Sequence, residues 1–428
     1  MKFNKWTVAL AAIGVVSLTS AAKAEEKASS VMTALSSTTL SGYVDTSAQW
    51  NPGTGNTFVA PYKFNSPSKA DGFNLDVVQL RIEKPLDESE WAAGYRVDLW
   101  AGPDANTLGT QSVFGSPNTA ASHGDFAIRQ AYAALRVPVG NGLDWKVGVF
   151  DSILGYESVE SPNNPNYTRS YGHSIEPQTH TGVLMSYRFS DLVSASAGVA
   201  NTMGPVINSR AFAPVQPAAA NAYPESYKTY MASLAVTAPD SMGFLSGSTL
   251  YGGVVNGFNN SIVGSGFAAP ELNAYVGATI ATPVTGLRLG AAWDFLNVNT
   301  TPHSGLLAGT KTEGEIWSIA GYASYQATEK LSLHGRFEYA SGEADHPAAL
   351  TGISGPIPPT LGGDLINNGL IAVTATVQYD LWKNVLSRIE FRWDHTEHGK
   401  AFGGVDAVTG GANRENAYML GANIIYKF

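Results

Sequence analysis

The 428-residue chain contains no cysteine, so something other than disulfide bonds must hold its fold. After the N-terminus, no stretch approaches the roughly 20 apolar residues that a membrane-spanning helix needs. Charged residues make up only 14% of the chain, which is unusually low for a soluble enzyme of this size. These absences argue against an inner-membrane helical protein and against an ordinary soluble enzyme.

The chain also lacks common catalytic motifs. It contains no G-x-S-x-G, no H-E-x-x-H and no P-loop. His180 and Ser186 fall on one face of a predicted strand but about 20 Å apart along it, too far for a nucleophile and its base. An outer-membrane hydrolase is therefore a weak alternative, and we expect no enzymatic activity and no cofactor.

One cluster of potential metal ligands occurs at residues 394–398, with the sequence DHTEH. Strand alternation places Asp394 and Thr396 on one face and His395 and Glu397 on the other, while His398 lies at the loop edge. These ligands do not converge on one ion, so a solvated rim is the better interpretation and no metal site is predicted.

The N-terminus has the order of a secretory signal peptide. Lys2 and Lys5 precede an apolar run from Trp6 to about Leu18, and the small residues that follow end in Ala22-Lys23-Ala24. We predict a signal peptide over residues 1–24, a short periplasmic segment over 25–37 and a transmembrane β-barrel over 38–428. The segment 25–37 is too short to form a plug domain, which excludes a plugged, receptor-fed transporter.

Glycine and aromatic residues are abundant: the chain has 45 Gly, 19 Tyr and 9 Trp. Low charge with many glycines and aromatics is typical of lipid-facing strands with aromatic girdles at the two membrane interfaces. The net charge is -9, and loss of the three lysines in the predicted signal peptide lowers it to -12. Such an acidic chain argues against nucleic acid as a partner.

Segments of 10 to 15 residues with period-2 alternation recur sixteen times. The gaps between them are alternately short and long, as expected for short periplasmic turns and long extracellular loops. We therefore predict an all-β fold, a transmembrane antiparallel β-barrel of about 16 strands, with a soluble β-sandwich or propeller as the alternative. The predicted strands cover residues 38–51, 73–84, 90–102, 126–138, 143–152, 179–190, 192–203, 226–238, 246–259, 271–283, 286–298, 313–327, 330–341, 368–381, 384–397 and 414–428.

Charged and apolar residues alternate within several of these strands, which assigns their faces. An Arg or Lys facing lipid costs about 2–4 kcal/mol at the bilayer midplane, so we expect the charged face to line a wet lumen. The predicted pore-lining residues are Arg81, Arg96, Asp98, Arg136, Asp294, Arg336, Glu338, Arg388, Glu390 and Arg392. The predicted outward aromatic girdle comprises Trp317, Tyr325, Trp393, Tyr426 and Phe428.

Two segments carry a family resemblance: SGYVDTSAQWN at residues 41–51, and the stretch from Gly155-Tyr156-Glu157 to NYTRSYG at 166–172. With them, essentially the whole mature chain resembles the β-barrel porin family described as OmpL-like. The resemblance implies an outer-membrane barrel assigned as a porin, with no catalytic residues to carry over. The C-terminal segment 422–428, which ends in Phe428, also resembles the terminal-strand signal read by the barrel assembly machinery.

The segment 153–178 exceeds the roughly 12–15 residues of most structureless connections, which favours a functional role. It resembles the third extracellular loop of sixteen-stranded porins, which folds inward and narrows the pore; the alternative is a surface loop packed on its neighbours. In the inward arrangement, Glu157, Glu160 and Glu176 would oppose the basic strands. The predicted constriction-loop residues are Glu157, Glu160, Arg169, His173 and Glu176.

The sequence thus predicts a porin in the outer membrane of a Gram-negative-type bacterium. We expect a passive diffusion channel for small hydrophilic solutes or ions, with a structural or adhesive barrel without transport as the alternative. The expected partners are outer-membrane lipid, the barrel assembly machinery and small hydrophilic solutes. The sequence leaves the identity and charge of the solutes open, and also whether the chain forms a homotrimer.

Overall fold

The computed structural model describes residues 37–53, 55–87, 89–110, 124–212, 226–259, 270–300, 312–344 and 369–428. The predicted signal peptide and nearly all of the predicted segment 25–37 lie outside these residues and remain predictions. Within the described residues, no helix is long and apolar enough to cross a membrane.

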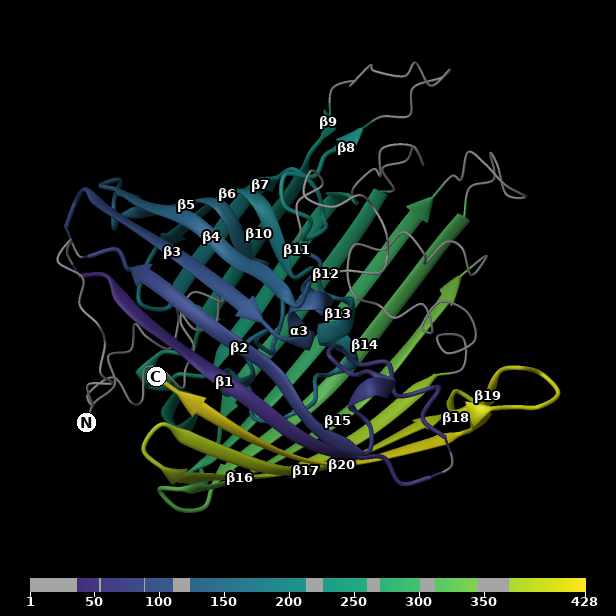
Figure 1. The fold of residues 1–428 in the computed structure, drawn as a ribbon. Coiled ribbons are helices and arrows are strands. Elements are labelled where there is room, and N and C mark those ends of the chain that lie inside the picture. The colour runs from purple at the N-terminus through teal and green to yellow at the C-terminus, as the bar shows by residue number, and fades with distance from the viewer. Residues whose placement is uncertain are drawn as a thin grey trace, which may run out of the picture.

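Sixteen strands form a closed antiparallel barrel, which confirms the predicted fold class (Figure 1). The barrel closes where β1 pairs with β20, in a register that runs from Tyr43 opposite Lys427 to Trp50 opposite Leu420. Closure leaves no unpaired sheet edge, which a strand-built membrane protein requires. The barrel strands are β1 (Thr39–Trp50), β2 (Gly72–Lys84), β3 (Ala92–Ala101), β4 (Phe126–Val137), β5 (Leu143–Asp151), β6 (Thr179–Arg188), β7 (Val193–Ala200), β10 (Thr229–Thr237), β11 (Thr249–Phe258), β12 (Pro270–Ala281), β13 (Leu287–Thr300), β14 (Thr312–Gln326), β15 (Leu331–Ala344), β16 (Leu370–Trp382), β17 (Val385–Thr396) and β20 (Asn416–Lys427).

Each predicted strand corresponds to one barrel strand, with small shifts at the ends. At 226–238 the barrel strand β10 begins three residues later than predicted, at Thr229. The preceding residues form β9 (Ser226–Tyr227), which pairs with β8 (Ala211–Phe212) in a small separate sheet. A second small sheet, β18 (Phe402–Val405) with β19 (Ala412–Arg414), lies in the connection between β17 and β20.

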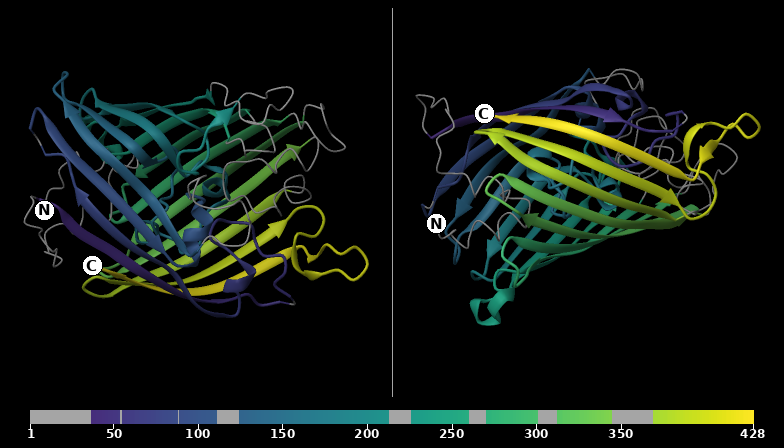
Figure 2. Two further views of the ribbon diagram at one scale, coloured as in Figure 1. Left: turned by 45° about the horizontal axis from the view of Figure 1, so that its top comes forward. Right: turned by 90° about the horizontal axis from the view of Figure 1, so that it is seen from below.

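Short and long connections alternate, so one end of the barrel carries turns and the other carries long loops. The C-terminus and the start of β1 lie at the turn end (Figures 1 and 2). One turn is longer than expected, because the 3-10 helix η3 (Asp240–Leu245) fills the connection between β10 and β11. Two further short elements lie in long connections: η1 (Pro67–Lys69) after β1 and α3 (Pro103–Leu108) after β3.

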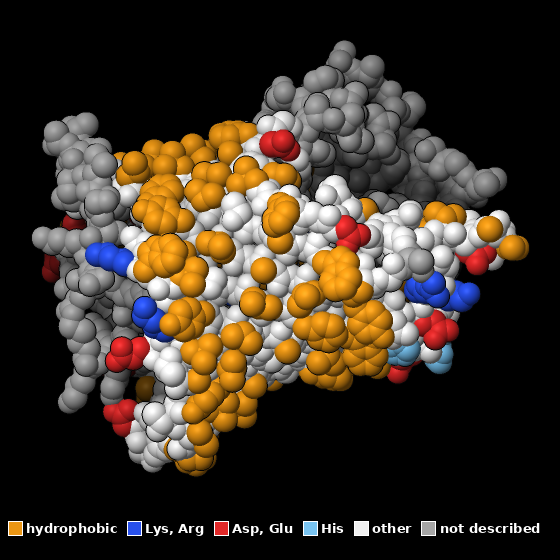
Figure 3. Space-filling model, turned by 60° about the horizontal axis from the view of Figure 1, so that its bottom comes forward, with side chains coloured by type: hydrophobic (Ala, Val, Ile, Leu, Met, Phe, Trp, Pro, Cys, Tyr) orange, Lys and Arg blue, Asp and Glu red, His pale blue; other side chains and the backbone are white. Residues whose placement is uncertain are grey.

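The outer wall is apolar and the inner wall is polar, as the alternation predicted. In β15, for example, Phe337 is 52% exposed on the outside, while Arg336 and Glu338 on either side of it are buried. Figure 3 shows hydrophobic side chains over the middle of one face of the barrel and charged side chains toward its two ends. This distribution fits an apolar band between two aqueous compartments.

Candidate functional site

The connection between β5 and β6, residues 152–178, lies inside the barrel. None of its residues is exposed, although it contains only two short helical elements, η2 (Ser161–Asn163) and α4 (Tyr171–Ile175). Ser170 caps α4, because its hydroxyl accepts a 3.0 Å hydrogen bond from the backbone N–H of His173. An irregular segment can be buried in this way only if its polar groups find partners, and here the barrel wall supplies most of them.

Arg336 of β15 forms the main attachment of the middle of this loop. Its Nη1 lies 2.8 Å from Oε1 of Glu157, and its Nε lies 2.8 Å from Oε1 of Glu338 on the same strand. Nη1 also donates to the backbone carbonyl of Thr168 at 2.8 Å. A fully buried guanidinium is stable only when its charge and its N–H groups are matched, and this one is.

Glu160 makes the second attachment, on the opposite part of the barrel. It forms ion pairs with Arg81, with Arg96 at 3.0 Å and with Arg129 at 3.2 Å. Burial alone would raise the pKa of Glu160, but the three guanidinium groups hold it below its usual value. Asp98 of β3 pairs with the same three arginines, so Glu160 completes an alternating cluster of charges.

Carboxylates on the wall also bind the backbone of the loop. Glu390 of β17 accepts hydrogen bonds from the amides of Tyr167, at 2.6 Å, and Thr168, at 2.9 Å. Glu338 accepts one from the amide of Tyr171 at 2.7 Å. In the opposite sense, Arg392 donates to the carbonyl of Arg169 at 2.7 Å. These contacts fix the path of the chain and not merely the position of single side chains.

Small residues let the loop approach the wall closely. A side chain at Gly172 would overlap the carboxylate of Asp294, and one at Gly290 of β13 would overlap the hydroxyl of Tyr156. The Tyr156 ring stacks on Tyr322 of β14 with centroids 4.1 Å apart. The loop therefore contacts strands on several sides of the barrel.

All ten predicted pore-lining residues lie at inward positions, but most differ from the expectation of a wet lining. Arg81, Arg96 and Arg136 keep partly exposed side chains, and Arg136 pairs with Asp144 near the turn end at 2.6 Å. The other seven are buried because the loop, or a neighbouring wall residue, occupies the space that water was expected to fill. These seven are Asp98, Asp294, Arg336, Glu338, Arg388, Glu390 and Arg392.

The expectation for Glu176 is wrong. Its carboxylate does not oppose a basic strand; Oε2 lies 3.1 Å from Nδ1 of His173 in α4. Burial and the adjacent Asp294 carboxylate raise the pKa of Glu176 well above its usual value. Arg169 also has no acidic partner among the described residues; its guanidinium donates to the carbonyls of Tyr167 and Val159, each at 3.0 Å. The sequence indicated neither relationship, because both depend on how the loop folds back on itself.

Arg129 is an inward-facing charged residue of the wall that the alternation missed. The register of β3 with β4 shifts between Asp98 and Leu99, and this bulge turns both Arg129 and its neighbour Gln130 inward. Arg129 and Arg136 have opposite parity within one predicted strand. Regular alternation would place one of these two arginines against lipid, which is energetically costly. This conflict in the sequence indicated an irregularity in the strand.

The connection after β1 also enters the barrel, which the sequence did not indicate. Tyr62 and Lys63 are buried there, and the amide of Lys63 donates to Oγ of Ser174 at 2.9 Å. The Tyr62 ring centroid lies 4.2 Å from the guanidinium carbon of Arg392, which also faces Tyr171 at 5.0 Å. A second loop thus packs on the first.

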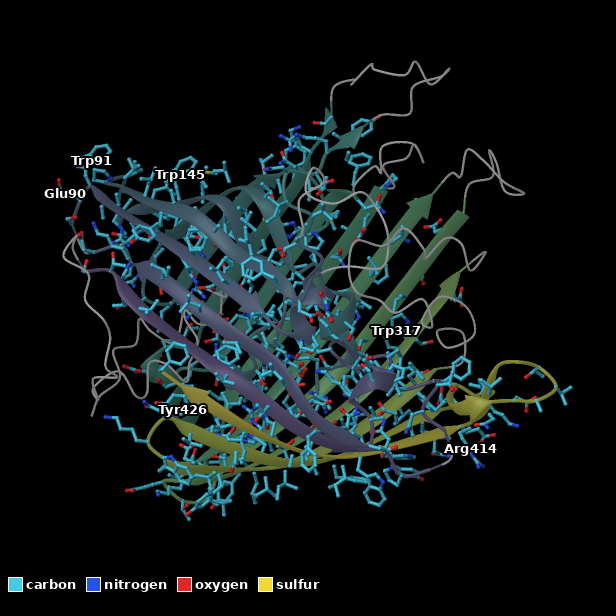
Figure 4. The ribbon with its side chains drawn as sticks, in the orientation of Figure 1. Glu90, Trp91, Trp145, Trp317, Arg414 and Tyr426 are labelled. Carbon is cyan, nitrogen blue, oxygen red and sulfur yellow. The ribbon has the colours of Figure 1, made fainter. Side chains whose placement is uncertain are left out.

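The predicted girdle residues lie on the outer face. Tyr325 and Tyr426 are 40% and 49% exposed, while Trp317, Trp393 and Phe428 are half-buried. In Figure 4, Trp317 lies toward the long-loop end, and Tyr426 lies near the turn end. Figure 4 also shows Trp91 and Trp145 at the turn end, two further aromatic side chains that the sequence analysis did not single out.

The other candidate motifs have structural roles. Asp394 and Thr396 are buried on the inner face, whereas His395 stacks on Trp393 outside, so the cluster divides as the alternation predicted. His180 contacts the carbonyl of Thr202 at 3.4 Å, and Ser186 bonds to Ser196 at 2.8 Å. Neither arrangement places a nucleophile beside a base.

A family model described as "Putative beta-barrel porin-2, OmpL-like" matches residues 37–428 of the chain. The chain belongs to this porin family. The match covers the barrel and the loop inside it, and confirms the resemblance carried by residues 41–51 and 155–172. No curated protein sequence matches this porin.

Solved structures share the fold of this porin at low sequence identity. The outer-membrane channel DcaP of Acinetobacter baumannii is 12% identical with a TM-score of 0.56, and the match covers 91% of this chain and 97% of that one. An anion-selective porin from Comamonas acidovorans is 10% identical with a TM-score of 0.53 over 92% and 99%. OmpT of Vibrio cholerae in a trimer form is 12% identical with a TM-score of 0.52 over 91% and 99%.

Family and fold together identify an outer-membrane porin-like channel of Gram-negative bacteria. Porins are non-enzymatic channels, which agrees with the expectation that the chain is not an enzyme. In this porin the loop 152–178 occupies the interior of the barrel and is held there by buried ion pairs.

Proposed function

We propose that this porin is a passive diffusion channel for small hydrophilic solutes, and that residues 152–178 form its constriction. The observation that carries the proposal is the inward position of this loop, which has no exposed residue and is attached through Glu157 and Glu160 to opposite parts of the wall. Solutes would pass between the loop and the polar inner face of the strands.

The partly exposed arginines support a path along the side of the barrel formed by β2, β3 and β4. Arg81 and Arg96 are there 19% and 12% exposed in their side chains, next to the buried Asp98 and Glu160. Charged groups in a narrow, low-dielectric passage act strongly on ions and polar solutes. These charged groups would favour solutes that can form hydrogen bonds with them in place of the hydrogen bonds that the solutes lose with water.

Planar-bilayer recordings test this proposal. Purified, refolded protein should give discrete conductance steps, and sugar-loaded liposomes that contain it should swell. If neither occurs, the barrel has a structural or adhesive role instead. That second candidate is favoured by one observation: the loop contacts strands all around the barrel, from β1 through Tyr167 to β13 through Gly172.

We also propose a homotrimer as the assembly in the membrane. OmpT of Vibrio cholerae, which has the same fold, was solved in a trimer form, and this supports the proposal. The mass of the protein in detergent, measured by light scattering with correction for bound detergent, would distinguish a trimer from a monomer.

A further inference from the structure

Three buried cations in the interior form no ion pair among the described residues: Lys63, Arg169 and Arg388, of which Arg388 is held by Gln378 and by two carbonyls of the loop 152–178. Lys63, in the connection after β1, is 1% exposed, and its Nζ has no hydrogen-bond partner. Arg169, in the loop 152–178, is 3% exposed and bonds only to backbone carbonyls, leaving its Nε without a partner. A buried charge is normally paired, because removal from water is costly.

A second buried lysine in the same connection, Lys69, is neutralised by two carboxylates. Lys69 is nearly as buried as Lys63, yet its Nζ lies 2.7 Å from Asp76 and 2.6 Å from Asp104. Lys63 has no such carboxylate within ion-pair distance in the part of the chain that the structure describes. Lys63 therefore differs from Lys69, the other buried lysine of the same connection.

Lys63 and Arg169 lie near the same aromatic ring, that of Phe64. The Nζ of Lys63 lies 5.5 Å from the centroid of the Phe64 ring, and the guanidinium carbon of Arg169 lies 5.6 Å from it. A cation facing an aromatic ring gains less than an ion pair, so Phe64 does not replace two counterions. A third polar atom close to these cations, Nε2 of His173, is also buried without a partner.

The nearby carboxyl groups are already engaged. Glu176 contacts His173, and burial together with the adjacent Asp294 carboxylate raises the pKa of Glu176 well above its usual value. Asp151 pairs with Arg129 at 2.5 Å. Burial, opposed in part by Glu176, lowers the pKa of Lys63 well below its usual value, as expected for an ammonium group that lacks a counterion.

We propose that Lys63 and Arg169 form a binding site for a small oxyanion, such as phosphate or sulfate, between the connection after β1 and the loop 152–178. An oxyanion accepts several hydrogen bonds at once, and so matches donors that converge from two loops. This inference deepens the proposed diffusion function by naming a class of solute. The site lies inside the barrel, away from the lipid-facing surface.

Thermal unfolding in detergent micelles tests the site without requiring conductance. Inorganic phosphate should raise the melting temperature of the wild type in a saturable manner, because a ligand that binds only the folded state stabilises it. Sodium chloride at equal ionic strength should not. A sulfate series tests whether the site takes oxyanions in general.

Variants identify the residues. Lys63→Met keeps the volume of the side chain but removes its charge, and should weaken phosphate binding at least tenfold by calorimetry; Arg169→Gln should do the same. Lys63→Arg should restore most of the binding. Lys400→Gln removes an equal charge from an exposed position at the long-loop end and should change the affinity less than twofold.

The outcomes separate this inference from the proposed function. Phosphate binding that is lost in Lys63→Met supports the site even if bilayers show no conductance, which would refute only the diffusion channel. Conductance without saturable phosphate binding, or equal phosphate binding in Lys63→Met and the wild type, would refute the oxyanion site but not the proposed channel.

Discussion

Arg336 and Glu157 lie 179 positions apart in the sequence and form a 2.8 Å ion pair in the interior of the barrel. Their side chains are 0% and 2% exposed, so the pair is shielded from water and salt. Among the described residues, Glu338 is the other acidic partner of Arg336, and Glu157 has no second cation but accepts a hydrogen bond from the amide of Ser170.

Removing one member of this pair should loosen the loop. Arg336→Met leaves Glu157 buried without its cation, and such a loss typically costs about 3–5 kcal/mol. Amide hydrogen exchange over residues 155–175 should become faster, while exchange in the strands changes little. As a control, Arg188→Met breaks a more exposed pair with Asp191, which is worth about 0–1 kcal/mol. Equal exchange in wild type and Arg336→Met would show that this pair does not hold the loop.

The loop should also limit the current. Replacing residues 158–169 by a short Gly-Ser linker should raise single-channel conductance, because it removes the atoms that narrow the passage. Glu157→Gln with Glu160→Gln should shift the reversal potential toward anion selectivity, since the arginines that face them lose their counterions. Glu176→Gln should shift it much less. If both changes leave conductance and reversal potential as in the wild type, the constriction lies elsewhere.

Attachment of the end of the loop should depend on pH through Glu176. The groups that face it are Asp294 of β13, Glu157, His173 of α4 and Lys63 of the connection after β1. Because the folded pKa of Glu176 is raised, the attached loop holds a proton that a detached loop releases. Attachment is therefore strongest below the ordinary pKa of about 4.3 and weakens as pH rises toward the raised value.

Hydrogen exchange over residues 171–178, corrected for the intrinsic pH dependence of amide exchange, measures this effect. Protection should fall between pH 5 and pH 8 in the wild type. In Glu176→Gln, which keeps the shape but cannot ionise, protection should stay constant. An identical fall in both proteins would assign the pH dependence to another group.

The orientation of the barrel can be tested at two described positions. Val408, in the hairpin between β18 and β19, is 93% exposed at the long-loop end. Asn141 lies in the tight turn between β4 and β5 at the other end. An epitope tag inserted at Val408 should be labelled on intact cells, whereas a tag at Asn141 should be labelled only after the outer membrane is permeabilised. The opposite pattern would invert the barrel.

Deletion of Phe428 should slow assembly. Its backbone exchanges two hydrogen bonds with Gly42, of 2.9 and 3.0 Å, where β1 and β20 close the barrel. The truncated chain loses these bonds and the terminal aromatic residue, so it should accumulate less in the outer membrane and be degraded in the periplasm. Phe428→Tyr, which keeps both bonds and the ring, is the control. Normal outer-membrane levels of the truncated chain would exclude a role for Phe428 in assembly.

The sequence by itself determined the sixteen strands and their faces. Charged side chains are costly where they face lipid. The apolar Phe337 between Arg336 and Glu338 therefore already indicates that Phe337 faces lipid and that its two neighbours face the interior. Such a pattern is local, and it identified the strands and the inward direction of the ten charged residues without knowledge of any contact. It identified the length of the loop 152–178 for the same reason.

Only the tertiary structure decided what those inward charges do. Glu157 and Glu160 pair with arginines on opposite parts of the wall, whereas Glu176 meets Asp294, and no local pattern distinguishes the three glutamates. The burial of Lys63, whose amide bonds to Ser174, also depends on residues far away in the chain. Alternation reports the direction of a side chain from its own strand, but a partner in the interior is set by how two distant segments meet in space.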